Sequence, residues 1–190
     1  MTIFLDMDGV IADFFGALAN QYKVDHWKSI QDRDRIFVEM RNTNFFVTIP
    51  EFYAETIFGD QGDGIYQRSL AIIDKVKEIA GDDWGICSSP LRNDEHNSAY
   101  WKREWLRCRD WLPPKLENLI FTSHKHKYAY NPVTRKPNIL VDDKPENIKA
   151  WNDAGGIGIL FQNNQDDLKE YLFVELEKAL EITRSTTHSS

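Results

Sequence analysis

Residues 1–14, MTIFLDMDGVIADF, decide how the rest of this chain is interpreted. The apolar run at about residues 2–5 is short enough to be a buried parallel strand. Asp6 and Asp8 follow it directly, and Gly9 allows the chain to turn. Two carboxylates this close repel each other, and a divalent cation relieves the repulsion. The stretch therefore predicts a strand that ends in a metal-dependent site.

Four more short apolar runs predict strands, at about residues 84–87, 119–122, 139–141 and 157–161. Amphipathic patterns between and after them predict helices. Strand and helix alternate from residue 65 onward, which is typical of a three-layer, doubly wound α/β fold with a parallel sheet. Ligands bind such sheets outside the carboxyl ends of the strands.

The segment 14–64 interrupts this alternation. It is rich in aromatic residues and ends in the turn-rich sequence GDQGDG at residues 59–64. We interpret it as a small, mainly helical cap inserted after the first strand, between core segments 1–13 and 65–183. Residues 184–190 are expected to form a disordered tail.

Size and charge limit the classes of function. A chain of 190 residues holds one domain with an insertion, and 42% hydrophobic with 28% charged residues is the balance of a globular protein. The formal charge of −7 argues against a long nucleic acid as partner. No apolar run approaches the ~20 residues that span a bilayer, and the start lacks the features of a signal peptide. We therefore expect a cytoplasmic protein that does not bind membranes.

A second acid pair, Asp142 and Asp143, also follows an apolar strand directly. With Asp6 and Asp8 it would form an oxygen-rich cage suited to Mg²⁺. Hydroxyl and ammonium groups follow the other strands, namely Ser88, Ser89, Lys125 and Lys127. Together these groups suit phosphoryl transfer through an aspartyl phosphate.

The residues at these strand ends resemble the four motifs of the haloacid dehalogenase superfamily over residues 3–161. Within it the chain is similar to the 5'(3')-deoxyribonucleotidases, which share a DMDGVxADF opening, an NFF triplet in the cap and an ICTSP-like second motif. Here these read DMDGVIADF at 6–14, NFF at 44–46 and ICSSP at 86–90. The resemblance implies a Mg²⁺-dependent phosphatase that acts on (deoxy)nucleoside monophosphates.

The resemblance also implies roles for the catalytic residues. Asp6 would be the nucleophile and Asp8 the general acid and then the general base. Mg²⁺ would be held by the Asp6 carboxylate, the Asp8 backbone carbonyl and one or both of Asp142 and Asp143. The lysine of the third motif is Lys125 by its spacing from a threonine, although Lys127 is close enough to compete.

The remaining implied contacts concern the substrate. Ser88 and Ser89 would bind phosphoryl oxygens, Arg92 would lie beside the phosphate, and Phe14 and Phe46 would line the nucleoside pocket. The family also shares a helix with a lysine and a tryptophan three residues apart, here Lys102 and Trp105, which we expect to be scaffold.

Two alternatives differ in substrate or in activity. The same catalytic groups could serve a phosphatase acting on a nucleic-acid end or on another small phosphoester, although the acidic charge disfavours the polymer. A catalytically silent interaction module with this fold would be expected to lack Asp6, Asp8 or the lysine, and all three are present. The sequence leaves open which base, which sugar and which phosphate position the enzyme would prefer. It also leaves open the oligomeric state, for which a homodimer is one option.

Overall fold

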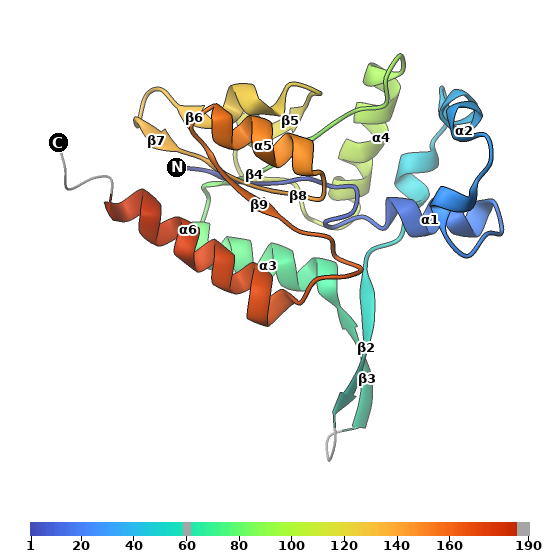
Figure 1. Cartoon of the computed structure of the whole chain (residues 1–190), viewed down its shortest axis with the longest axis horizontal. Helices are drawn as coiled ribbons and strands as arrows, with labels where there is room; N and C mark the ends of the chain where they lie inside the picture. Colours follow the sequence, from blue (N-terminus) through green and yellow to red (C-terminus); the bar gives the residue numbers. More distant parts are fainter. Residues whose placement is uncertain (59–61, 186–190) are drawn as a thin grey trace.

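A computed structural model of the protein describes residues 1–58 and 62–185, with the backbone alone at 54–58 and 62–66. Its centre is a five-stranded parallel sheet in the order β5-β4-β1-β8-β9 (Figure 1). The strands are β1 (Ile3–Leu5), β4 (Trp84–Ser88), β5 (Leu119–Phe121), β8 (Ile139–Asp142) and β9 (Ile157–Leu160). Each strand lies where an apolar run predicts it, and in each of them one end differs by one residue from the predicted bound. The parallel α/β fold is therefore confirmed.

Helices cover both faces of this sheet, with α3 and α6 on one face and α5 on the other (Figure 1). Their bounds are α3 (Arg68–Ala80), α4 (Glu95–Arg107), α5 (Pro145–Asp153) and α6 (Val174–Ser185), the last preceded by a π-helical segment (Leu168–Phe173). Successive side chains of a strand point to opposite faces. Accordingly Ile3 and Leu5 belong to one apolar cluster with α3 and α6, and Phe4 belongs to a second with Trp151 of α5.

The segment after β1, which the sequence predicts to be a cap, forms short helices. They are α1 (Phe14–Gln21), a 3₁₀ turn (Trp27–Ser29), α2 (Arg33–Met40) and a second 3₁₀ turn (Phe45–Thr48). Both α-helices begin at an aspartate whose carboxylate accepts a backbone N–H, 2.9 Å from Gly16 N for Asp13 and 3.1 Å from Arg35 N for Asp32. The last turn of the cap contacts α4.

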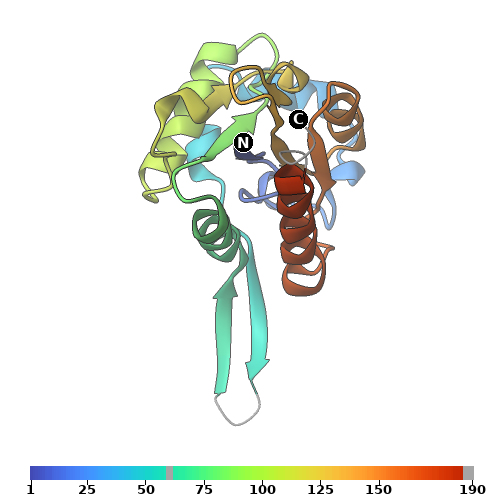
Figure 2. The same cartoon turned by 90° about the vertical axis from the view of Figure 1, so that its left-hand side faces the viewer.

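A β-hairpin that the sequence interpretation did not include follows the cap helices. Strands β2 (Tyr53–Phe58) and β3 (Gly62–Gln67) pair antiparallel and project away from the body of the molecule (Figures 1 and 2). Of the turn-rich sequence at 59–64, residues 59–61 lie outside the described residues and 62–64 belong to β3, so its described part is strand and not the end of a helical segment. The expected boundary between residues 64 and 65 falls inside β3.

The remaining elements are short. Two 3₁₀ turns, Leu116–Asn118 and Lys125–Tyr128, flank β5, and a small hairpin pairs β6 (Tyr130–Asn131) with β7 (Lys136–Pro137). Helix α6 continues to Ser185, so the first two residues of the expected tail are helical, and 186–190 lie outside the described residues. Among the helices of the described residues, none is long and apolar enough to cross a membrane.

Candidate active site

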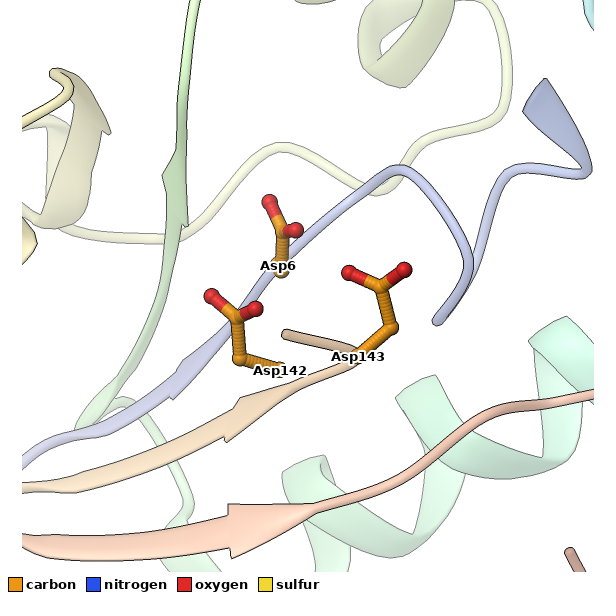
Figure 3. A group of neighbouring side chains, drawn as sticks. All are labelled: Asp6, Asp142 and Asp143. Carbon is orange, nitrogen blue, oxygen red and sulfur yellow. The ribbon is translucent and has the colours of Figure 1, made fainter. Parts of the chain in front are cut away.

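The carboxyl ends of the central strands bring the predicted acids together. Leu5 pairs with Ile86 on one side and Val141 on the other, so Asp6 and Asp142, the next residues along these strands, lie at the same level. One carboxylate oxygen from each of Asp6, Asp142 and Asp143 lies within 4.8 Å of the others (Figure 3). All three side chains are buried, so this is a concentrated negative site at the sheet edge.

Gly9 permits the close approach of the two acid-bearing loops. It adopts a left-handed φ of 84°, and a Cβ there would lie 2.7 Å from Oδ2 of Asp143. A side chain at this position would be strained and would collide with the carboxylate.

Lys125 lies among the acids, whereas Lys127 is exposed. Nζ of Lys125 lies 3.0 Å from Oδ1 of Asp6 and donates to Oδ2 of Asp142 at 2.5 Å. Burial lowers the pKa of Lys125, but the charges of Asp6 and Asp142 outweigh it and raise the pKa overall. The ammonium group therefore stays charged.

Asp142 and Asp143 differ in their hydrogen bonds. The Asp142 carboxylate accepts from Lys125, from Asn147 Nδ2 at 3.1 and 3.0 Å, and from the backbone N–H of Lys144 at 2.9 Å. Oδ1 of Asp143 is buried and accepts no hydrogen bond among the described residues. Asp143 is the member of the pair with an oxygen available for another ligand.

Lys102 is part of this site, and its expected role as scaffold alone is wrong. Its Nζ donates to Oδ2 of Asp8 at 2.6 Å and to Oγ of Ser88 at 3.0 Å, and lies 5.0 Å from the ring centre of Phe46. The side chain is fully buried. A signal was available in the sequence, because Lys102 falls on the apolar face of α4 three residues before Trp105, and lysines are almost never fully buried unless paired.

The pKa values of Asp6 and Asp8 are shifted in opposite directions. Burial alone would raise the pKa of Asp6, but the charges of Lys125 and Lys102 more than compensate and lower it. Burial raises the pKa of Asp8, with Lys102 opposing and Asp6 reinforcing the shift. An ionised carboxylate beside a protonatable one is the pairing that a nucleophile and a general acid require.

A cavity of about 1120 Å³ opens onto the acids and is lined both by the residues that follow the sheet strands and by the helices after β1. Predicted residues that line it are Asp6, Asp8, Asp143, Ser89, Arg92, Phe14 and Phe46. The rings of Phe14 and Phe46 stack with centroids 5.9 Å apart at 15°. Ser88 is fully buried against Lys102, and Ser89 donates a hydrogen bond to the Thr122 carbonyl at 3.3 Å.

A family model described as 5' nucleotidase, deoxy (pyrimidine), cytosolic type C protein matches residues 1–171. The chain belongs to this family. It is also 23% identical over 165 residues to the mitochondrial 5'(3')-deoxyribonucleotidase of Homo sapiens, with 77% of this chain and 63% of that protein aligned. The match thus spans less than two thirds of that relative's length. A solved hydrolase structure from Streptococcus pneumoniae TIGR4 is 13% identical with a TM-score of 0.40, covering 85% of this chain and 92% of that one.

The charges of the site fit a divalent cation, as expected for a member of this nucleotidase family. Four acids, Asp6, Asp8, Asp142 and Asp143, lie with the two buried lysines that pair with them, Lys102 and Lys125, so these six groups carry a net charge of −2 when all are ionised. Oδ1 of Asp8 and Oδ1 of Asp143 are both buried and accept no hydrogen bond from the part of the chain that the structure describes. Such oxygens are the hard ligands that Mg²⁺ prefers.

Proposed function

We propose that this chain is a Mg²⁺-dependent phosphomonoesterase that hydrolyses (deoxy)nucleoside monophosphates through an aspartyl phosphate on Asp6. The observation that carries the proposal is the cluster of three buried acids, the partly exposed Asp8 and two buried lysines, several members of which line a cavity that also holds two stacked phenylalanines. Family membership supports the same substrate class.

In the first half-reaction the Asp6 carboxylate attacks phosphorus, and the bond from phosphorus to the nucleoside oxygen breaks. Asp8, protonated at the start, gives its proton to that leaving oxygen. In the second half-reaction the Asp8 carboxylate takes a proton from water, whose oxygen attacks phosphorus and releases inorganic phosphate from Asp6. Lys125 and Lys102 provide positive charge next to these groups.

Mg²⁺ would be held by the Asp6 carboxylate, the backbone carbonyl of Asp8 and the unpaired oxygen of Asp143. When bound, it neutralises charge on the phosphoryl oxygens. Asp142 is engaged by Lys125 and Asn147 and would orient these groups. Ser89 and Arg92 would contact the phosphoryl group from the cavity wall, whereas Ser88 accepts a hydrogen bond from Lys102 and would hold that lysine in place. The stacked rings of Phe14 and Phe46 would contact the nucleoside.

The test is phosphate release from 5'- and 3'-deoxy- and ribonucleoside monophosphates, sugar phosphates and a 3'-phosphorylated oligonucleotide, each with Mg²⁺ and with EDTA. We expect Mg²⁺-dependent release, with mononucleotides preferred. Asp6→Asn should lower kcat by about 10³-fold or more, whereas Asp82→Asn, at an exposed turn, should retain activity.

Three results would contradict the proposal in different ways. Preference for the oligonucleotide or a sugar phosphate would retain the mechanism and reject the substrate. Turnover by Asp6→Asn near that of the wild type would reject the nucleophile. Absence of release from every compound would favour a silent module. The cytoplasmic location stays a prediction, since the curated relative is mitochondrial.

A further inference from the structure

Asn163, in the loop after β9, is hydrogen-bonded to the loop that carries Asp8. Its backbone N–H donates to the Gly9 carbonyl at 3.0 Å, and its side-chain Nδ2 donates to the Val10 carbonyl at 2.6 Å. The side chain is 2% exposed. Residues 153 positions apart in the sequence are thus joined by a short, buried hydrogen bond.

Arg68 holds the Asn163 amide in one orientation. Its Nε donates to Oδ1 of Asn163 at 2.6 Å, and its Nη2 donates to the Asp166 carbonyl at 2.6 Å. Because the amide oxygen only accepts and the amide nitrogen only donates, the guanidinium group directs Nδ2 toward the catalytic loop. Asn163 therefore has a defined donor, oriented by a charged partner.

The same arginine lies where the hairpin and the cap return to the core. Arg68 is the first residue of α3 and directly follows β3. Its backbone N–H donates to the Phe52 carbonyl at 2.9 Å, and Phe52 N donates to Oγ of Ser69 at 2.8 Å. Phe52 lines the cavity. The Asn163 contacts thus connect the catalytic loop, the loop after β9 and the end of the cap.

A shift of Gly9 would be transmitted to an acid of the site. Gly9 lies so close to Asp143 that a single added carbon would meet its carboxylate at 2.7 Å. The Gly9 carbonyl is held by Asn163, and Asp8 is the preceding residue. Loss of the side-chain hydrogen bond from Asn163 would let this loop move relative to Asp143 and would leave the Val10 carbonyl without this donor.

We propose that Asn163 is a positioning residue that holds the loop of Asp8 and Gly9 in the arrangement required for metal binding and turnover, with Arg68 orienting its amide. The inference rests on the proposed function and extends it to residues outside the four recognised motifs. Asn163 acts through the backbone of the loop.

The experiment compares Asn163→Asp with the wild type by Mg²⁺ titration calorimetry and by steady-state kinetics. The substitution keeps the acceptor for Arg68 and replaces the donor to Val10 by an oxygen. We expect at least about fivefold weaker Mg²⁺ binding, kcat lower by about tenfold, and KM for the nucleotide within about twofold. Arg68→Gln, which leaves Asn163 intact, should cause the same changes to a smaller extent.

Asn152→Asp is the matched control, because Asn152 uses its oxygen to accept from the Gly158 N–H at 2.7 Å, a role that aspartate can fill. The proposal would be overturned if both Asn163→Asp and Arg68→Gln bound Mg²⁺ and turned over substrate as the wild type does and lowered only the melting temperature. If Asn163→Asp does not fold, Arg68→Gln decides alone. A wild type that hydrolyses no phosphoester would refute the proposed function, while the Mg²⁺ titration would still test Asn163.

Discussion

At the scale of single residues, two buried lysines divide the acids of the site into two groups. Lys125 contacts Asp6 and Asp142, whereas Lys102 contacts Asp8. A buried ammonium favours the ionised form of the carboxylate next to it. Lys125 therefore favours the ionised form of Asp6, the proposed nucleophile, and Lys102 limits how far burial raises the pKa of Asp8. Asp8 can then give up a proton in one half-reaction and take one in the next.

Replacing Lys102 by Met should change the pH profile as well as the rate. Without the ammonium group the pKa of Asp8 rises further, so the limb of the kcat profile that reports its ionisation moves to higher pH. The loss of positive charge should also lower kcat by about 10²-fold. Lys102→Arg, which retains the charge, should show the smaller shift. Equal profiles for Lys102→Met and the wild type would exclude Lys102 from control of Asp8.

At the scale of elements, the loop between β1 and α1 depends on a glycine with two distinct requirements. Gly9 has a left-handed φ of 84° and lies in contact with Asp143. Gly81, at the end of α3, also has a positive φ, of 58°, but a Cβ there would meet no atom of the described residues within 4 Å. A comparison of substitutions at these two glycines therefore distinguishes the effect of backbone strain, which both share, from the effect of a collision with Asp143, which only Gly9 has.

Gly9→Ala should weaken Mg²⁺ binding by at least about tenfold, because the added methyl group displaces the Asp143 carboxylate. Gly81→Ala should cost about 1 kcal/mol of unfolding free energy and leave Mg²⁺ affinity unchanged. Titration calorimetry and urea denaturation measure the two quantities. Equal Mg²⁺ affinity in Gly9→Ala and Gly81→Ala would show that the approach of Gly9 to Asp143 does not matter for the metal.

At the scale of the whole molecule, folding gathers acids that the unfolded chain keeps apart. Asp6 and Asp143 come from strand ends far apart in the sequence, and both become buried. Burial, reinforced by the charges of Asp6 and Asp142, raises the pKa of Asp143 to about 8. In the unfolded chain an aspartate titrates near ~3.9. The metal-free fold therefore takes up a proton that the unfolded chain does not hold at neutral pH.

This difference predicts how stability without metal depends on pH. Below about pH 4 Asp143 is protonated in both states, and between about pH 4 and 8 only the folded chain keeps the proton. Asp143 then lowers the free energy of unfolding by up to about 1.4 kcal/mol per pH unit as the pH rises, and above about pH 8 the loss is complete.

Urea denaturation in EDTA at pH 5, 6.5 and 8 measures this pH dependence of the free energy of unfolding. Asp143→Asn should remove the part of it that comes from Asp143. Mg²⁺, which replaces the proton, should stabilise the wild type more at pH 8 than at pH 5. Free Mg²⁺ at about 100 times its Kd would add about 2.7 kcal/mol to the free energy of unfolding. Parallel pH dependences for the wild type and Asp143→Asn in EDTA would refute the account of Asp143.

The parallel sheet, its five strands and the placing of Asp6, Asp8, Asp142 and Asp143 at strand ends could all be predicted from the sequence. Each depends on a local pattern, either a short apolar run or the acids that follow it directly. The distinction between Lys125 and Lys127 stayed open at that level. It needs the path of the chain after β5, which buries one lysine against the acids and exposes the other.

Only the tertiary structure decided the projecting hairpin, the contact of Lys102 with Asp8 and the hydrogen bonds from Asn163 to the catalytic loop. The last two join residues 94 and 153 positions apart. Local sequence records whether a side chain is apolar, charged or able to turn the chain. It does not record which distant backbone or side chain will lie beside it, because that depends on how the strands and helices pack around one core.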